Sequence, residues 1–212
     1  MRIGIIGAGF IGRAVARLAV KHGHEVMISN SRDPRTLTSA MISIGCRIGT
    51  ATDAVEFGDV VLLAIPFFAL EDIAPGPFAG KVLLDATNYY PARDDQIPAL
   101  DSGQATTSEL VARHFEGAKV VKAFNAILER DIEPDARLVG APDRRALPIA
   151  GDDALAKATV AELLGELGFD VVDAGVLGEG WRFERARPAY CVRLDVAGLE
   201  AALANAPWSS LV

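Results

Sequence analysis

The stretch Arg2-Ile3-Gly4-Ile5-Ile6-Gly7-Ala8-Gly9-Phe10-Ile11-Gly12 opens the chain and decides its fold. Its first half is an apolar run of strand length, and its second half is a GxGxxG sequence. A helical pattern follows, with apolar residues at three- and four-residue spacing as far as Lys21. A GxGxxG sequence carries little information alone, but between a strand and a helix it is typical of a dinucleotide-binding turn.

Each glycine of this turn has its own expected role. Gly7 permits the tight turn, Gly9 lets the backbone approach a pyrophosphate, and Gly12 lets the helix lie close to the strand. The N–H groups and the dipole of the helix then face the phosphates. The alternative is a glycine-rich turn that holds no ligand.

The end of the second expected strand indicates which dinucleotide is bound. The chain there reads Ser29-Asn30-Ser31-Arg32, where an NAD-binding protein usually has an acid for the ribose 2′-hydroxyl. Instead, Ser31 offers a hydroxyl and Arg32 a planar cation, which suit a 2′-phosphate. Arg35 adds a second cation one turn on, and Asp33 is expected to cap the next helix. The sequence therefore predicts NADP; the alternative is that Arg32 is an ordinary solvated arginine.

Composition excludes several classes of protein. The 212 residues carry a formal net charge of −7 and no run rich in lysine or arginine, which argues against nucleic-acid binding. Cys46 and Cys191 lack CxxC spacing, and with three scattered histidines we expect reduced thiols and no metal site. The apolar run Val60–Leu70 is interrupted by Pro66 and is far shorter than the ~20 residues that cross a bilayer. Without a secretory signal, we expect a soluble cytoplasmic protein that does not contact membranes.

Strand and helix patterns alternate along the first part of the chain. Continuous apolar runs at Asp59–Ile65, Lys81–Asp85 and Lys119–Phe124 are typical of strands covered on both faces. Their alternation with helices predicts a parallel sheet with right-handed crossovers. We therefore expect residues 1–124 to form a Rossmann-type, doubly wound α/β domain that binds the dinucleotide.

Beyond residue 124 the pattern changes. Glu129–Asp143 is expected to be irregular, and a helix capped by Asp152 with Leu155 on its apolar side is expected after it. The expected flanking strands are Arg145–Ala150 and Phe169–Val172. Because such a unit is too small to fold well alone, we expect residues 125–212 to form a small α/β lobe packed against the first domain.

Residues that follow the central strands are the candidates for the reaction site, because ligands of open parallel sheets lie at the carboxyl ends of the strands. Ile65 and Pro66 follow the fourth strand, Asn88 follows the fifth, and Asn125 and Ile127 follow the sixth. The two asparagines either orient a carboxamide or a substrate carbonyl, or cap turns. Pro66, Phe67 and Ile127 are expected to form an apolar floor and wall, and the alternative for Phe67 is core packing.

No nucleophile with a base, and no convincing pair of carboxylates, stands among these residues, so we name no catalytic residue. Hydride transfer between two organic cofactors needs none, because the cofactors carry the reacting atoms and the protein supplies alignment and exclusion of water.

Several motifs together resemble the coenzyme F420-dependent NADP oxidoreductases. Besides the opening stretch they are Asn30-Ser31-Arg32, Ala64-Ile65-Pro66, Asp85-Ala86-Thr87-Asn88, Val121-Lys122-Ala123-Phe124-Asn125 and Ala150-Gly151-Asp152-Asp153. The resemblance spans about residues 1–176. It implies that NADPH and a 5-deazaflavin exchange hydride in a cleft between a Rossmann domain and a small C-terminal lobe.

The resemblance also implies roles for individual residues. The stretch Ala8–Ile11 would contact the pyrophosphate. The 2′-phosphate would be held by Ser31, Arg32 and Arg35. The surroundings of the nicotinamide and its acceptor would be Pro66, Asn125 and Ile127.

The tail departs from the family pattern between Gly178 and Tyr190. Its three arginines, Arg182, Arg185 and Arg187, either meet an anionic substrate or form a solvated or interfacial basic stretch. This departure affects the identity expected for the acceptor, and it leaves the prediction of NADP unchanged.

The leading hypothesis is an NADP(H)-dependent oxidoreductase that transfers hydride to or from a small-molecule acceptor, a coenzyme F420-like deazaflavin or a flavin. One alternative is an imine or keto reductase like pyrroline-5-carboxylate reductase, although that class usually continues into a long helical dimerisation domain. Another is a non-catalytic NADPH-binding sensor module. A homodimer formed through the C-terminal lobe is plausible.

Overall fold

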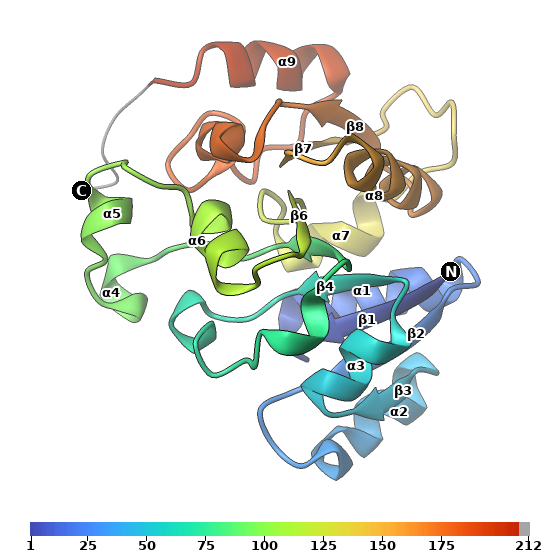
Figure 1. Ribbon diagram of the computed structural model, residues 1–212. Helices are drawn as coiled ribbons and strands as arrows, with labels where there is room; N and C mark the ends of the chain where they lie inside the picture. Colours follow the sequence, from blue (N-terminus) through green and yellow to red (C-terminus); the bar gives the residue numbers. More distant parts are fainter. Residues whose placement is uncertain (208–212) are drawn as a thin grey trace.

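An eight-stranded sheet with helices on both faces runs through the computed structural model, which describes residues 1–207 (Figure 1). The strands are β1 (Arg2–Ile6), β2 (Glu25–Ser29), β3 (Arg47–Gly49), β4 (Val60–Leu63), β5 (Val82–Asp85), β6 (Lys119–Lys122), β7 (Ala146–Gly151) and β8 (Asp170–Asp173). Their order is β3-β2-β1-β4-β5-β6-β7-β8, and the neighbours are parallel except for β6 and β7. The predicted Rossmann-type, doubly wound α/β fold is confirmed, because the chain winds outwards from β1 and returns through β4 to wind the other way.

The helices cover both faces of the sheet. The α-helices are α1 (Phe10–Lys21), α2 (Thr38–Ile44), α3 (Ala51–Phe57), α4 (Pro91–Asp94), α5 (Pro98–Asp101), α6 (Thr107–His114), α7 (Glu129–Asp135), α8 (Ala154–Glu166) and α9 (Val196–Ala204). Helices α1, α2 and α8 lie in one core cluster, and α3 and α6 lie in the other. The 3-10 helices are η1 (Pro34–Leu37), η2 (Phe67–Ala69), η3 (Gly76–Phe78) and η4 (Leu177–Phe183). Local caps define several starts: Asp33 accepts a hydrogen bond from the N–H of Arg35, as predicted, and Thr106 with Glu109 forms a capping box.

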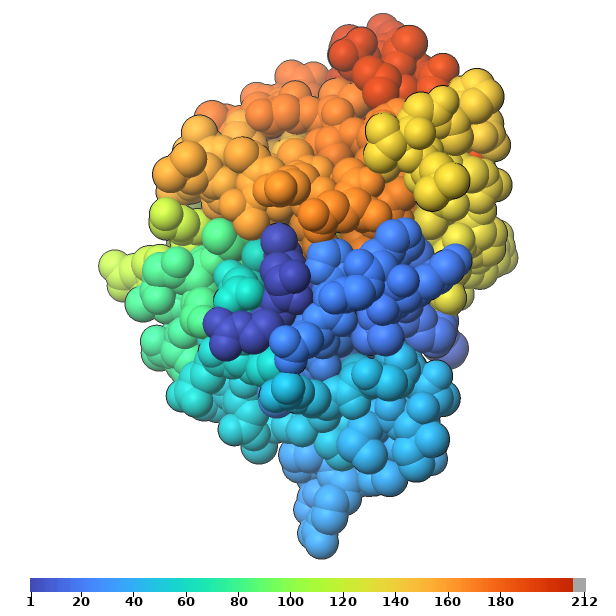
Figure 2. Space-filling view, turned by 90° about the vertical axis from the view of Figure 1, so that its right-hand side faces the viewer, coloured from blue at the N-terminus to red at the C-terminus, as the bar shows by residue number. Residues whose placement is uncertain are grey.

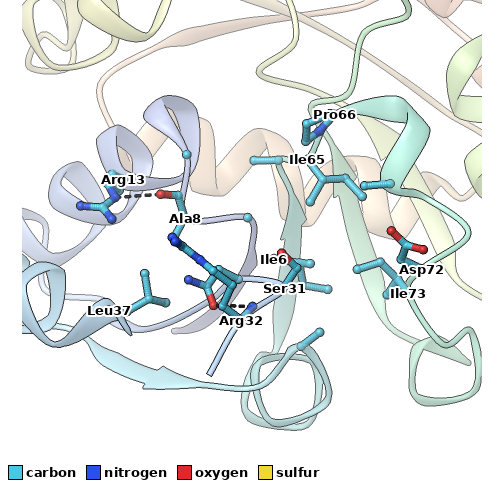
Figure 3. A pocket seen from close by; sticks show the side chains of 16 residues that line it. Ile6, Ala8, Arg13, Ser31, Arg32, Leu37, Ile65, Pro66, Asp72 and Ile73 are labelled. Atoms are coloured by element: carbon cyan, nitrogen blue, oxygen red, sulfur yellow. Dashed lines mark hydrogen bonds between the residues drawn. The ribbon is translucent and has the colours of Figure 1, made fainter. Parts of the chain in front are cut away.

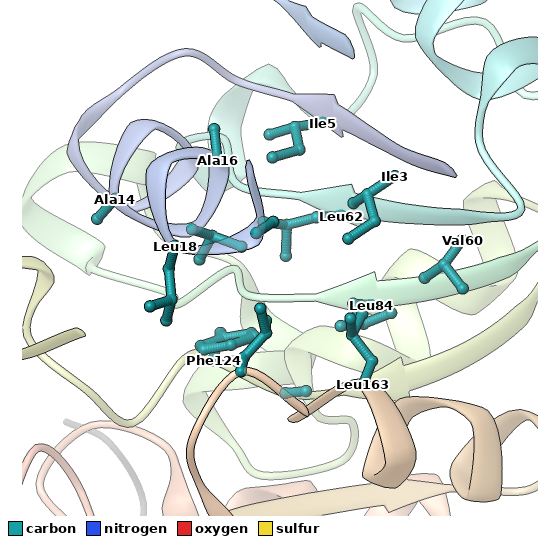
Figure 4. Close-up of a cluster of buried hydrophobic side chains, with 14 of the residues drawn as sticks. Ile3, Ile5, Ala14, Ala16, Leu18, Val60, Leu62, Leu84, Phe124 and Leu163 are labelled. Atoms are coloured by element: carbon teal, nitrogen blue, oxygen red, sulfur yellow. The ribbon is translucent and has the colours of Figure 1, made fainter. Parts of the chain in front are cut away.

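Strand β4 is apolar throughout because both of its faces are buried. Val60 and Leu62 pack in the cluster that contains α1 and α8, whereas Val61 and Leu63 pack in the cluster that contains α3 and α6. Figure 4 shows α1, the strands and α8 contributing to the first cluster. Fully burying each such side chain stabilises the fold by about 1.5 to 3 kcal/mol. The two-sided core holds the carboxyl ends of β1 and β4 rigidly side by side.

The sheet continues beyond the predicted boundary at residue 124. Strand β7 pairs antiparallel with β6, so that Lys122 lies opposite Ala150, and β8 pairs parallel with β7. In Figure 2 the C-terminal third, orange to red, lies directly on the N-terminal part. The division into residues 1–124 and 125–212 stays a prediction, and the last five residues of that lobe lie outside the described range.

Two local expectations for the C-terminal part were wrong. Residues Glu129–Asp135 form helix α7 instead of an irregular segment; its first turn is acidic, which favours a helix start, and Pro134 comes only in its last turn. Helix α8 is capped by Asp153, not Asp152, and Leu155, expected on its apolar side, is 75% exposed. Asp152 instead accepts a hydrogen bond from the N–H of Leu177 at 2.8 Å.

Candidate functional site

A cavity of about 580 Å³ lies at the carboxyl ends of β1, β2 and β4. This is the point at which the strand order reverses, where ligands of doubly wound sheets bind. Figure 3 shows Arg13, Ser31 and Arg32 on one side of it, and Ile65, Pro66, Asp72 and Ile73 on the other. Its further lining residues are Ile6, Gly7, Ala8, Gly9, Asn30, Leu37, Ala51, Ala64 and Ala69.

The glycine turn has the shape that a dinucleotide needs. Gly7 has φ +106°, and a Cβ there would lie 2.2 Å from the carbonyl oxygen of Ala64. A Cβ on Gly12 would lie 1.9 Å from the carbonyl oxygen of Gly7, so only glycine lets α1 pack this closely. A Cβ on Gly9 would meet nothing within 4 Å, which leaves open space beside the start of α1. Within residues 1–207, no side chain caps that helix start. Its first N–H groups are therefore free of a side-chain acceptor and suit an anion.

The three residues expected at the 2′-phosphate differ in position. Ser31 and Arg32 line the cavity, and the N–H of Arg32 donates to Oδ1 of Asn30 at 3.0 Å. The Arg32 guanidinium is exposed and forms no ion pair within residues 1–207. Arg35 does not line the cavity and pairs with Asp33, its Nη2 lying 2.7 Å from Oδ2.

Arg13 is a cavity residue that the sequence analysis missed. It lies in the first turn of α1, lines the cavity, and donates from Nε to the carbonyl oxygen of Ala8 at 2.7 Å. Its position four residues after Gly9 places it on the helix face beside the turn, which was the available signal.

These features fit NADP. The open turn and free N–H groups suit a pyrophosphate, and Arg13 and Arg32 bring two cations to one wall. The first carboxylate that follows β2 along the chain, Asp33, accepts hydrogen bonds from Arg35. Asp33 is therefore engaged away from the position at which an acid would bind a ribose 2′-hydroxyl.

A second cavity, of about 310 Å³, adjoins the first and shares Ala64, Ile65 and Pro66 with it. Ile65 and Pro66, both predicted to bind the cofactor, thus lie between the two spaces. The remaining lining residues are Phe10, Ile11, Ala86, Asn88, Tyr90, Arg93 and Glu129. The residues of the predicted turn are therefore split between the two cavities. Gly7, Ala8 and Gly9 line the first cavity, and Phe10 and Ile11 line the second. Gly12 is buried beneath the turn.

Asn88 and Asn125 are held against each other at the strand ends. Nδ2 of Asn88 donates to the carbonyl oxygen of Asn125 at 3.0 Å, and Nδ2 of Asn125 donates to Oδ1 of Asn88 at 3.2 Å. Asn125 also donates to the carbonyl oxygen of Phe183, and its own Oδ1 has no partner within residues 1–207. Asn88 lines the second cavity, whereas Asn125 is buried behind it. Ile127 is buried in the main core and lines neither cavity.

The backbone before Asn125 is strained. Phe124 is buried and has φ +61°, a left-handed conformation that is an outlier for a bulky residue. Such conformations cost of order 1–3 kcal/mol and concentrate at functional sites, where the surrounding structure maintains them. Here the strain accompanies the turn that carries Asn125 to Asn88.

A buried network of charged side chains lies close to Asn88 and Asn125. Nζ of Lys122 donates to Oγ1 of Thr107 at 2.6 Å and to the carbonyl oxygen of Thr87 at 3.3 Å, and lies 3.7 Å from Asp85 and 3.5 Å from Glu184. The side chains of Lys122 and Asp85 are fully buried. The network joins β5, β6 and α6 to the end of η4. The sequence analysis missed it, because Lys122 stands inside an otherwise apolar strand pattern.

The three arginines of the tail are engaged within the protein. Arg182 pairs with Glu179 at 2.5 Å, and its guanidinium lies over the Trp181 ring. Arg187 is buried and donates to the carbonyl oxygen of Pro207. The Arg185 guanidinium lies 4.8 Å from the centre of the Tyr90 ring, beside the second cavity.

Among the residues that the structure describes, no three His, Cys, Asp or Glu side chains gather in a way that would hold a metal ion. None of the helices in that part of the chain has the length and apolar character needed to span a bilayer.

Part of the chain matches a known protein family. Residues 2–89 match the family described as NADP oxidoreductase, coenzyme F420-dependent. This matched segment contains every residue that lines the first cavity.

Individual proteins are similar over most of the chain. A hypothetical protein from Sinorhizobium meliloti is 32% identical, with a TM-score of 0.80 and coverage of 92% of this chain and 94% of that one. A protein from Arthrobacter sp. FB24, provisionally described as an F420-dependent NADP reductase, is 28% identical, with a TM-score of 0.71 and coverage of 86% and 87%.

The metalloreductase STEAP3 of Rattus norvegicus is 28% identical over 186 residues, which is 86% of this chain. The chain spans only 36% of the length of that relative. Imine reductases and reductive aminases are less than 20% identical and share the fold alone.

Proposed function

The chain belongs to the family of coenzyme F420-dependent NADP oxidoreductases, a family of NADP-dependent enzymes, and on this premise we propose that it transfers hydride between NADPH and a deazaflavin or flavin-like acceptor. The observation that carries the proposal is the pair of adjoining cavities. The first has the features of a site for a phosphorylated dinucleotide, and the second adjoins it across Ile65 and Pro66.

The first cavity would hold the nucleotide. The N–H groups at the start of α1 and the open space at Gly9 receive the pyrophosphate, and Ser31 with Arg32 receives the 2′-phosphate. Arg35 contributes little in this arrangement, because Asp33 already neutralises it. Residues 1–124 supply all of this site, in keeping with the proposed division of the chain.

The second cavity would hold the acceptor against the reacting end of the nucleotide. NADPH, when bound, supplies the hydride. Ile65 and Pro66 lie between the two cavities, and Ile11 together with the exposed Phe10 gives the second cavity an apolar wall. Asn88 presents an amide to the polar side, and Asn125 holds Asn88 in place. The C-terminal lobe supports this side, because Asn125 also donates to Phe183.

Rapid mixing of the protein and NADPH with candidate acceptors tests the proposal. We expect NADPH absorbance to decay in a single turnover when coenzyme F420, FMN or FAD is added, with reduction of the acceptor at the same rate. NADPH that binds and is never oxidised by a deazaflavin or a flavin would refute the proposed acceptor class. NADH oxidised as readily as NADPH would refute the nucleotide specificity.

A further inference from the structure

Tyr90 occupies a position that the proposed hydride transfer does not use. It follows β5, lines the second cavity, and is half-buried. Its hydroxyl lies 2.7 Å from the hydroxyl of Tyr190, which comes from the C-terminal part of the chain. A phenol beside the acceptor, hydrogen-bonded to a second phenol, is a candidate acid or base.

Two cations lie against the Tyr90 ring. The guanidinium carbons of Arg93 and Arg185 are 4.7 and 4.8 Å from the ring centre. The Arg93 charge is balanced by Asp94 at 2.8 Å, whereas Arg185 forms no ion pair within residues 1–207. Arg185 therefore leaves a net positive charge close to the ring. Such a charge stabilises the negative oxygen that remains when a phenol releases its proton.

Tyr190 is suited to donate its hydrogen bond to Tyr90. Burial and the contact with Tyr90 raise the pKa of Tyr190 above its ordinary value, so this phenol keeps its proton. A protonated Tyr190 stabilises the oxygen of Tyr90 and leaves the Tyr90 proton free for another acceptor. The other charged group at the cavity is Glu129, which lies on α7 and is exposed.

We propose that Tyr90 is the proton donor to the acceptor, with Tyr190 and Arg185 as the residues that position and assist it. This inference rests on the proposed hydride transfer. Hydride and its electron pair pass from NADPH to an unsaturated carbon of the acceptor. The O–H bond of Tyr90 breaks, its electron pair stays on the oxygen, and the proton goes to a heteroatom conjugated with that carbon. Solvent then returns a proton to the Tyr90 oxygen, while Tyr190 keeps its own.

The inference narrows the class of acceptor. A conjugated ring that contains C=N or C=O takes one hydride and one proton, so NADPH and a proton together give NADP and the reduced ring. An acceptor that takes single electrons, such as a metal ion, has no use for this proton. The chain is thus equipped for two-electron reduction of a heteroaromatic acceptor.

The test compares Tyr90→Phe with Tyr89→Phe, a matched change at the adjacent residue. The Tyr89 hydroxyl is engaged by Asp101, Asp95 and Ile97 and lines neither cavity. The measurements are NADPH affinity by fluorescence titration, melting temperature, and the single-turnover hydride transfer to coenzyme F420 or FMN in H₂O and in D₂O. Arg185→Gln, which keeps the hydroxyl and removes the cation, is a second variant should Tyr90→Phe fail to fold.

We expect Tyr90→Phe to bind NADPH as the wild type does, to transfer hydride at least about 100-fold more slowly, and to lose the D₂O effect of the wild type. Tyr89→Phe keeps both the rate and the D₂O effect, and Arg185→Gln slows transfer by a smaller factor than Tyr90→Phe. Wild-type rate and D₂O effect in both Tyr90→Phe and Arg185→Gln would overturn the inference and leave the proposed function intact. A wild type that binds NADPH and reduces neither acceptor would instead count against the proposed function.

Discussion

Replacing Arg32 with alanine removes the cation proposed to bind the 2′-phosphate. The guanidinium is exposed, lines the first cavity and has no carboxylate partner among the described residues, so its loss leaves no buried charge unpaired. Hydrogen bonds to charged groups contribute about 1.5 to 3 kcal/mol, and solvent screening favours the lower part of that range here. The NADPH dissociation constant should therefore rise about 10- to 40-fold, since each factor of ten corresponds to about 1.4 kcal/mol.

The effect is specific to the phosphorylated nucleotide. Calorimetric titration of Arg32→Ala with NADPH and with NADH should show weaker binding of NADPH and little change for NADH. Arg35→Ala is the matched control, because that arginine is already paired with Asp33 and should change neither affinity. Raising the salt concentration should weaken NADPH binding to the wild type more than to Arg32→Ala. An equal loss of affinity for both nucleotides would refute the role of Arg32.

Three further predictions concern the scaffold. Gly12→Ala should lower both NADPH affinity and melting temperature, because its Cβ would lie 1.9 Å from a backbone oxygen; titration and thermal unfolding that match the wild type would contradict this packing. Lys122→Met should cost about 3 to 5 kcal/mol in urea unfolding, because two buried carboxylates lose their cation, and a loss below about 1 kcal/mol would show that the network is not a stabilising ion pair. Burial alone would raise the pKa of Asp94, but hydrogen bonds, led by that from Arg93, hold it below its usual range. The resulting stability is present above the unfolded value of 3.8 and is lost as pH falls through the folded pKa, so Asp94→Asn should be less stable at pH 7 and its free energy of unfolding should depend less on acid pH.

The nucleotide side of the site was predictable because its signals are local. The close contact at Gly12 is with Gly7, in the same strand-turn-helix unit, and the GxGxxG spacing alone indicates this tight turn. Ser31 and Arg32 follow the neighbouring strand, so the parallel order of β1 and β2 was enough to bring them to the turn. Arg35 illustrates the limit of this reasoning, since its partner Asp33 is only two residues away and yet was assigned to the helix cap alone.

The acceptor side was not predictable to the same degree. Asn88 and Asn125 both follow strands, and no pattern distinguishes the one that lines the cavity from the one buried behind it. The difference arises from Phe183, whose carbonyl oxygen occupies one N–H of Asn125 from a distant part of the chain. Tyr90 and Tyr190 likewise meet across 100 residues of sequence, through packing that periodicity does not encode.

This asymmetry has a consequence for function. Every residue of the first cavity lies between Ile6 and Ile73, inside the segment that matches the family, whereas the second cavity also takes Tyr90, Arg93 and Glu129 from beyond it. Membership of the family therefore supports the assignment of the nucleotide more directly than that of the acceptor. The acceptor depends on groups that the match does not cover, including Arg185 and Tyr190 next to Tyr90. Changes around those groups should alter the choice of acceptor and leave NADPH affinity as it is, because the two cavities share only Ala64, Ile65 and Pro66.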